Sequence, residues 1–267
     1  MADVYLHGHH PSVLASHGAR TAADSAAYLL PHLHDGMHVL DVGCGPGTIT
    51  LDLAEAVGPS GRVVGVENVT GPLEHARRSA AARGDVRTSF ELADVMGLPY
   101  ADASFDVVHA HQVLQHLTEP VGALREMARV TRPGGLVAVR DVDYASMVWH
   151  PASDLMTRWL ELYRHLARLN HAEPDAGRHL VAWAHAAGLT RLTPSASLWT
   201  YATPEQCAWW GGTWARRTLE STFAAQAVDH GLATPADLAQ ISAAWQDWST
   251  HPDAWFAMTH AEIVAHV

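Results

Sequence analysis

The sequence predicts an α/β fold in which helices cover both faces of a largely parallel sheet. Short apolar runs alternate along the chain with segments of helical periodicity, and this order builds crossover connections between parallel strands. One apolar run, residues 39–42, ends in a glycine-rich turn, and a helical pattern begins at Thr48 directly after it. The 267 residues are enough for one such domain with added segments.

The other elements follow from the same periodicity. The pattern predicts helices over residues 25–33, 71–84, 119–131 and 175–187, and strands over residues 192–201 and 254–267. Gly188 is expected to end the fourth of these helices. The last strand is expected at an edge of the sheet.

The glycine-rich turn has the spacing D-x-G-x-G-x-G, from Asp41 to Gly47. Its glycines permit positive φ and let a ligand approach the backbone. The dinucleotide fingerprint is instead G-x-G-x-x-G, with a helix N-terminus facing a pyrophosphate. The Asp41 carboxylate at the strand end can accept a hydrogen bond from an amine or a water. The turn therefore predicts an adenosine-bearing cofactor with an ammonium group rather than one dominated by phosphates.

Four further segments extend this pattern in the same order. They are residues 62–68, which end in Glu67-Asn68, residues 91–95, residues 105–117 and residues 132–139. Together with the turn, over residues 36–143, they resemble the class I S-adenosylmethionine-dependent methyltransferases, especially the small-molecule branch related to ubiquinone and menaquinone biosynthesis. The resemblance implies a Rossmann-like, doubly wound sheet of seven strands whose last strand is antiparallel, between the fifth and sixth. It implies S-adenosyl-L-methionine as the cofactor.

The resemblance also implies which residues hold the cofactor. Glu67 corresponds to the acidic residue that binds the ribose hydroxyls, and Asp94 with Val95 to the adenine contacts. N-terminal residues from Tyr5 to Arg20 are expected to close over the site. The full expected set is Tyr5, Arg20, Asp41, Gly43, Cys44, Gly45, Gly47, Glu67, Asn68, Asp94, Val95, His111 and Gln112.

The implied reaction is an in-line displacement at a sulfonium methyl by a small-molecule acceptor, which we expect to be a specialised metabolite. His111 and His116 follow the fourth strand, where an open α/β sheet binds ligands, and a neutral imidazole can act as a general base. His10, Asp141 and Tyr144 are further candidates by placement. An acceptor that is already a good nucleophile needs no base.

The domain organisation combines a core with added helical segments. Residues 1–35 are expected to form an N-terminal lid and helix, residues 36–202 and 250–267 the core, and residues 144–170 a helical cover. Residues 203–249 are a helical insertion that serves as a substrate cover or a dimer contact. Helix starts are predicted at Thr203-Pro204 and Thr234-Pro235.

Tryptophans concentrate in the added segments. The face of a tryptophan ring can form the wall of a site for an apolar or cationic ligand. The alternative interpretation is that these tryptophans are core residues or dimer contacts. The expected substrate contacts are Trp149, Trp159, Trp209, Trp210 and Trp214.

The composition of the chain indicates which classes of partner it can bind and where in the cell it is expected. With 28 acidic and 17 basic residues and a net charge of −11, the chain lacks the footprint of a nucleic-acid enzyme and disfavours anionic membranes. No apolar run spans a bilayer, so we expect a cytoplasmic protein. The two cysteines predict no disulfide framework, and the cluster from His7 to His10 has no converging partners, so no metal is expected.

Two alternative functions remain at this point. One is an enzyme of the same fold that uses bound S-adenosylmethionine for a cyclisation or rearrangement. The other is a nicotinamide-dependent oxidoreductase, which is disfavoured because Thr48 stands where the dinucleotide fingerprint requires a third glycine.

Overall fold

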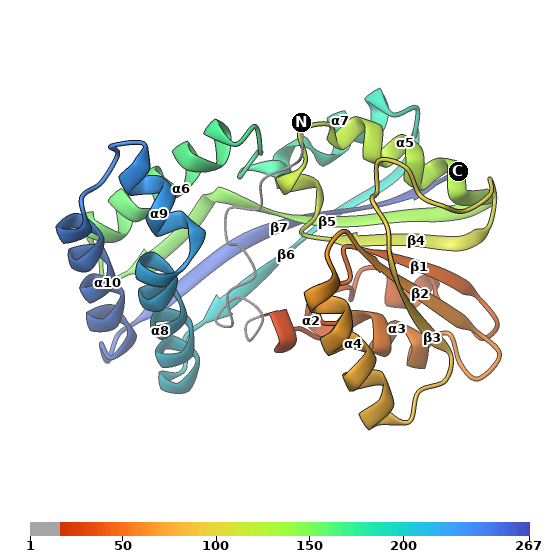
Figure 1. Ribbon diagram of the computed structural model, residues 1–267, viewed down its shortest axis with the longest axis horizontal. Helices are drawn as coiled ribbons and strands as arrows, with labels where there is room; N and C mark the ends of the chain where they lie inside the picture. The colour runs from red at the N-terminus through yellow and green to blue at the C-terminus, as the bar shows by residue number, and fades with distance from the viewer. Residues whose placement is uncertain (1–16) are drawn as a thin grey trace.

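The computed structural model describes residues 17–267, which form a seven-stranded sheet with helices on both faces (Figure 1). The strand order is β3-β2-β1-β4-β5-β7-β6. The strands are β1 (His38–Val42), β2 (Arg62–Glu67), β3 (Thr88–Leu92), β4 (Phe105–His111), β5 (Thr131–His150), β6 (Arg191–Tyr201) and β7 (Trp255–His266). The first five pair in parallel, whereas β7 is antiparallel to both β5 and β6. The predicted doubly wound sheet and its antiparallel last strand are confirmed.

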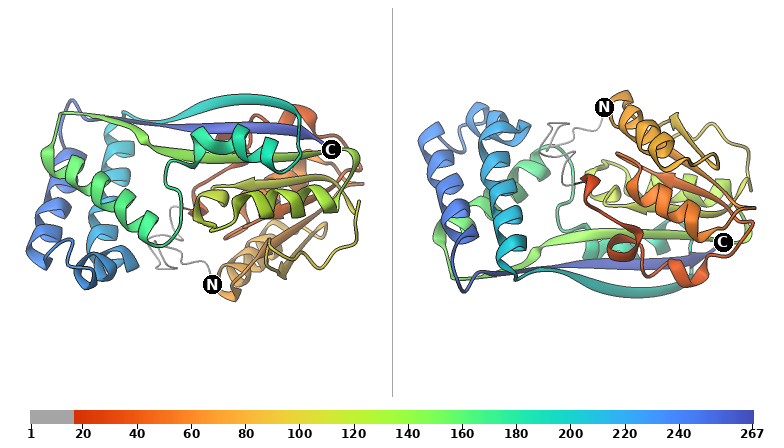
Figure 2. Two further views of the ribbon diagram at one scale, coloured as in Figure 1. Left: turned by 90° about the horizontal axis from the view of Figure 1, so that it is seen from above. Right: turned by 90° about the horizontal axis from the view of Figure 1, so that it is seen from below.

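The central strands are apolar on both faces because helices cover both. In β1, Val39 packs with one helical layer, and Leu40 and Val42 pack with the other, as the alternation of a strand requires. The first layer contains α2 (Ala22–Ser25) and α3 (Thr48–Ala56), with α4 (Thr70–Arg83) beside it. The second contains α5 (Pro120–Val130) and α7 (Leu180–Ala186). Figure 2 shows these layers from the two sides.

Strands β5, β6 and β7 are longer than the others and carry the sheet beyond the core. Four helices gather at that end of the molecule (Figure 1): α6 (Asp154–Leu169), α8 (Pro204–Glu220), α9 (Thr222–Asp229) and α10 (Pro235–Ser249). Thr203 and Thr234 each form a capping box with proline at the start of the following helix, which confirms the two predicted helix starts.

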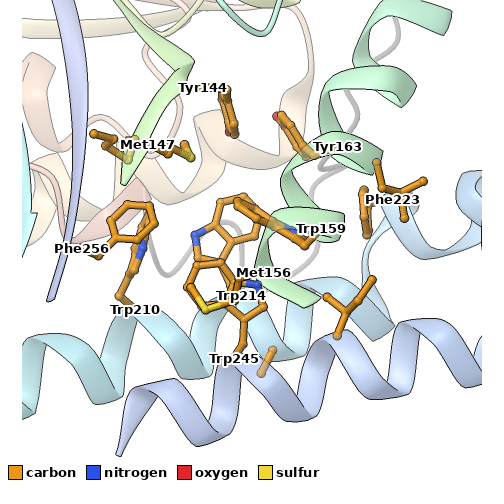
Figure 3. Packing of buried hydrophobic residues seen from close by; sticks show 14 of the residues in the cluster. Tyr144, Met147, Met156, Trp159, Tyr163, Trp210, Trp214, Phe223, Trp245 and Phe256 are labelled. Atoms are coloured by element: carbon orange, nitrogen blue, oxygen red, sulfur yellow. The ribbon is translucent and has the colours of Figure 1, made fainter. Parts of the chain in front are cut away.

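The helical end has its own aromatic core, which packs against the projecting strands (Figure 3). Trp159 of α6 is 0 % exposed, with its ring 4.4 Å from that of Trp214 and 5.0 Å from that of Trp245. Phe256 of β7 and Tyr163 of α6 lie in the same cluster. This second core fixes helices α6, α8 and α10 to the end of the sheet.

The expected helical cover over residues 144–170 is wrong in its first part. Residues 144–150 continue β5, and the helix begins only at Asp154, where the Ser153 hydroxyl accepts the backbone N–H of Met156. The pairing of β5 with β7 shifts register between Asp143 and Val148. The backbone N–H of Tyr144 donates to Pro174 instead of to β7, so this bulge re-aims the strand toward the helical end.

Three smaller expectations also need correction. Residues 25–33 form no continuous helix: α2 ends at Ser25, and a 3₁₀ turn, η1 (Leu30–His32), surrounds Pro31, which disfavours helix in the preceding residue. Residues 175–187 divide into η3 (Ala176–His179) and α7, although Gly188 does end the segment at φ +93°. The last strand, β7, is not an edge strand, because β6 pairs along its outer side.

Within residues 17–267, no helix combines the length and the apolar composition needed to cross a bilayer.

Candidate active site

The three glycines of the turn after β1 all have left-handed backbone conformations, with φ of +65° at Gly43, +52° at Gly45 and +78° at Gly47. They have different surroundings. A Cβ on Gly47 would lie 2.7 Å from the Ala76 Cβ, so this glycine permits close packing of α3 against α4. A Cβ on Gly45 would meet nothing within 4 Å. Gly45 therefore leaves its backbone open to a cavity in front of the turn.

This first cavity lies at the carboxyl ends of β1, β2 and β4, the edge at which open α/β sheets bind ligands. Among the described residues, it is lined by His17, Arg20, Asp41, Gly43, Cys44, Gly45, Pro46, Thr48, Ile49, Glu67, Asn68, Pro72, His111, Gln112, Val113, His116 and Leu117.

Two carboxylates are fixed in the first cavity by neighbouring groups. Glu67, at the end of β2, accepts the backbone N–H of Gly45 at 3.1 Å and that of Asn68 at 3.0 Å. Asp41, at 2 % exposure, accepts the Thr50 hydroxyl at 2.5 Å and lies 2.8 Å from Nδ1 of His109. Each carboxylate oxygen keeps further lone pairs, so both can still accept from a ligand.

Gln112 occupies a constrained position directly after β4. Its φ is +54°, which is uncommon for a residue with a side chain and typical of functional sites. Its backbone N–H donates to the carbonyl of Arg140 at 2.7 Å, and its Oε1 accepts from the Arg20 guanidinium at 2.8 Å. Its amide nitrogen lies 2.8 Å from Nε2 of His260, a buried residue of β7 whose ring lies 4.4 Å from that of Trp199.

His111 and His116 both line the first cavity, but neither has the electrostatics of an efficient base at neutral pH. Burial, followed by the charge of Arg140, holds the pKa of His111 well below its usual range. Burial lowers the pKa of His116 to about 3. Both imidazoles are therefore neutral near pH 7, and each is a weak proton acceptor.

A second cavity, of about 450 Å³, lies between the sheet and the helical end. Its volume falls in the range of small-molecule sites. Aromatic side chains from β5, β6 and α8 form much of its wall. Among the described residues, it is lined by His17, Ala19, Arg20, Asp24, Gln112, Gln115, His116, Tyr144, Leu198, Trp199, Thr200, Tyr201, Gln206, Trp209, Trp210, Trp214, Arg217 and Met258.

The two cavities share part of their walls. His17, Arg20, Gln112 and His116 line both of them. The hydrogen bond between Arg20 and Gln112 lies at this junction. The two cavities are therefore adjacent at this point.

The structure brings most of the expected cofactor residues to the first cavity. Gly47, Asp94 and Val95 are not among the described residues that line it, and Tyr5 lies outside the described residues, as does the candidate base His10. Asp141 lines neither cavity. Its side chain is buried beneath the 3₁₀ turn η2 (Leu114–His116), where it accepts the N–H of Gln115, and burial raises its pKa to about 8.

The expected substrate contacts divide into two groups. Trp209, Trp210 and Trp214 line the second cavity, as does Tyr144, which stacks on Tyr163 with ring centres 4.3 Å apart. Trp149 instead stacks on Phe256, and Trp159 lies inside the aromatic core. Neither is exposed along the cavity wall, because both fill space between the sheet and the helices.

Several lining residues were missed from the sequence. Trp199 and Tyr201 of β6 and Arg217 of α8 line the second cavity. Arg217 could have been found, because Trp210, Trp214 and Arg217 are spaced i, i+4 and i+7 and so share one helix face. Trp199 and Tyr201 lie on the same face of β6, but the sequence of this strand does not indicate which of its two faces would contact a ligand. Among the described residues, no three His, Cys, Asp or Glu side chains are grouped as a metal site would require.

Comparisons with known proteins agree with this geometry. A family model described as a methyltransferase domain matches residues 33–201. An uncharacterized methyltransferase of Schizosaccharomyces pombe is 34 % identical over 97 % of this chain and 95 % of its own length. A ubiquinone/menaquinone biosynthesis C-methyltransferase of Burkholderia cenocepacia is 34 % identical over 61 % of this chain and 71 % of its own.

Among solved structures, the YcgJ protein of Bacillus subtilis superposes with a TM-score of 0.59 and 19 % identity, covering 90 % of this chain and 96 % of that one. This likeness supports the fold. The family match and the full-length relative confirm the family that the motifs resemble. Because this family uses S-adenosylmethionine, the alternative of a nicotinamide-dependent oxidoreductase is excluded. The chain belongs to the methyltransferase-domain family and is an S-adenosylmethionine-dependent methyltransferase.

Proposed function

We propose that the chain transfers the methyl group to a small-molecule acceptor bound in the second cavity. The observation that carries this proposal is the shared wall of the two cavities at Arg20 and Gln112. A cofactor site and an acceptor site that meet at one wall satisfy the main requirement of methyl transfer, which is to hold two reactants in contact.

The first cavity fits S-adenosylmethionine. The open backbone at Gly45 permits close approach, and Glu67 presents a fixed carboxylate for the ribose hydroxyls. Asp41 offers lone pairs to an ammonium group or to a bridging water. When bound, S-adenosylmethionine supplies an electrophilic methyl group on a sulfonium, and the protein supplies position and exclusion of water.

The residues at the junction favour positioning over proton transfer. Neutral, weakly basic His111 and His116 contribute little as general bases. Arg20 and Gln112 can donate hydrogen bonds that orient an acceptor toward the first cavity. We therefore expect the acceptor to be nucleophilic once bound, and proximity to provide most of the acceleration.

The added segments define which acceptor is taken. We propose that α8, with the rest of residues 203–249 and α6, acts as the substrate cover, because α8 contributes Trp209, Trp210 and Trp214 to the second cavity. A cover built outside the core agrees with an acceptor from specialised metabolism.

The test is a screen for release of S-adenosylhomocysteine from S-adenosylmethionine with a library of aromatic and polyketide-like acceptors. Methyl transfer predicts equimolar methylated product and S-adenosylhomocysteine. The alternative of a cyclisation or rearrangement predicts an isomerised product with no such release. Conversion that needs no cofactor binding at all would contradict the proposal.

A further inference from the structure

We infer that the second cavity selects a planar, apolar acceptor carrying a carboxylate, and that Arg217 binds this carboxylate. The inference rests on the proposed function, since it assigns the chemistry of the acceptor to the same cavity. It concerns recognition and adds no chemical step.

Arg217 lies in the wall of the second cavity although only 5 % of it is exposed. It stands on the face of α8 that also presents Trp210 and Trp214, and its guanidinium carbon lies 5.1 Å from the centre of the Trp214 ring. A guanidinium carries five N–H donors in a planar fork that matches a carboxylate. It can therefore bind ligand oxygens in addition to its contacts within the protein.

A second guanidinium, that of Arg20, also lines this cavity. Arg20 lies 5.4 Å from the centre of the Trp199 ring and donates to Gln112 at the junction of the cavities. The one carboxylate among the described lining residues is Asp24. Its oxygens already accept from the backbone and hydroxyl of Thr21 and from the Ser25 hydroxyl, as the cap of α2.

This local charge runs against the composition of the chain. The whole molecule carries a net charge of −11, yet the described residues that line this cavity include two arginines and a single carboxylate, that of Asp24, which already accepts hydrogen bonds within the protein. A cationic cavity in an acidic protein favours an anionic ligand, and the low dielectric of a buried site strengthens that preference.

Aromatic rings form the rest of the wall that matters for ligand shape. The rings of Tyr201 and Trp210 stack with centres 4.4 Å apart and an interplanar angle of 8°, and Trp209 lies beside them with its ring centre 5.9 Å from that of Trp210. Trp199 faces the cavity from β6. Aromatic faces of this kind favour planar ligands, which stack with little loss of conformational entropy.

The experiment uses matched probes that differ only in charge. Calorimetry measures binding of 2-naphthoate and 2-naphthamide, benzoate and benzamide, and indole-3-carboxylate and indole-3-carboxamide to the full chain saturated with S-adenosylhomocysteine. We expect the carboxylate of at least one pair to bind roughly tenfold or more tightly than its amide, as a charge-assisted hydrogen bond predicts.

Variants assign the preference to Arg217. R217Q should remove it, and R217K should keep part of it, because the charge remains but the fork is lost. The matched control is R216Q, which changes the exposed neighbour on α8 and should keep the full preference. A thermal unfolding scan identifies any variant that fails to fold.

The inference is overturned if no carboxylate binds the wild-type chain more tightly than its amide, absence of binding included. It is also overturned if folded R217Q keeps the preference, in which case Arg217 only supports the Trp214 ring. Binding of S-adenosylhomocysteine is measured first in each sample. If S-adenosylhomocysteine does not bind the wild-type chain, the proposed function itself is contradicted. If S-adenosylhomocysteine binds but no carboxylate is preferred over its amide, only this inference is contradicted.

Discussion

Glu67 is the side chain that links the glycine turn to the second strand. Because its carboxylate is already fixed by the N–H groups of Gly45 and Asn68, it can accept ribose hydroxyls without further ordering. We expect Glu67→Ala to weaken S-adenosylhomocysteine binding by about 1.5 to 3 kcal/mol, the usual cost of losing charge-assisted hydrogen bonds. Calorimetry measures the change, with Glu74→Ala, an exposed carboxylate on α4, as the control. Equal affinities for wild type and Glu67→Ala would show that the ribose is held elsewhere.

His116 provides a test of site electrostatics through stability. Its pKa is lowered from about 6.5 to about 3 in the folded protein, so the unfolded chain binds the extra proton as the pH falls through that window. The contribution of His116 to the free energy of unfolding therefore decreases as the pH falls below about 6.5. His116→Gln should remove this decrease, which amounts to up to about 1.4 kcal/mol per pH unit. Urea unfolding at several pH values between 6.5 and 4.5 measures the slopes, and identical slopes would contradict the assignment.

The same neutral imidazoles make a kinetic prediction. Since the pKa values of His111 and His116 lie well below 6.5, neither should produce an acidic limb in kcat near that pH. A fixed acceptor assayed between about pH 5.5 and 8 should give a profile that His116→Gln leaves unchanged in shape. A limb near pH 6.5 that disappears in this variant would identify His116 as a base after all.

Among single residues, those that belong to a sequence motif could be predicted from the sequence. Residues that reach the site only through tertiary packing could not. Glu67 and Gly45 follow from the strand-turn-helix pattern and the resemblance. Gly47 belongs to the same motif, yet it serves the packing of α3 against α4. Tyr201 reaches the second cavity only because β6 pairs with β7 beyond the core.

Among the elements, the tryptophan-bearing helices show where periodicity is sufficient and where it fails. Helical periodicity places Trp159, Leu162 and Leu166 on one face of α6 that is buried, but Leu155 and Leu169 at the ends of the same face are 37 % and 44 % exposed. A helical pattern identifies the buried face, but it cannot tell a core contact from a cavity wall. Local sequence likewise gave no sign of the bulge in β5.

Two tryptophans in this helical end should therefore behave differently. Trp159→Ala should lower the free energy of unfolding by about 3 to 5 kcal/mol, because it empties a fully buried site in the aromatic core. Trp209→Ala should leave stability nearly unchanged and reduce acceptor binding, because Trp209 is 39 % exposed and lines the second cavity. Denaturant unfolding and acceptor titration measure the two effects.

The control for this comparison is Trp255→Ala, which removes a tryptophan of similar exposure, 40 %, that is not among the described residues lining either cavity. It should change neither quantity strongly. If Trp209→Ala destabilises the fold and leaves acceptor binding intact, the assignment of α8 to the acceptor site fails.

At the scale of the whole molecule, strand order explains why the active site lies where it does. The order reverses between β1 and β4, so the carboxyl ends of these strands open a crevice that the glycine turn and Gln112 enter from its two sides. The alternation of strands and helices in the sequence is sufficient to predict a parallel sheet covered on both faces, whereas the doubly wound order follows from the family resemblance. The second cavity depends on contacts between β6 and α8, which neither periodicity nor motif spacing encodes.

Gly45 offers the most direct test of the central claim that the cavity before the glycine turn holds the cofactor. A valine there would project into open space in the cavity and would strain a backbone at φ +52°. The control is Gly97→Val, at an exposed glycine with equal space around it and no positive φ. Calorimetric titration of S-adenosylhomocysteine should give no detectable binding to folded Gly45→Val and normal binding to Gly97→Val. Wild-type affinity in Gly45→Val would contradict the cofactor site described above.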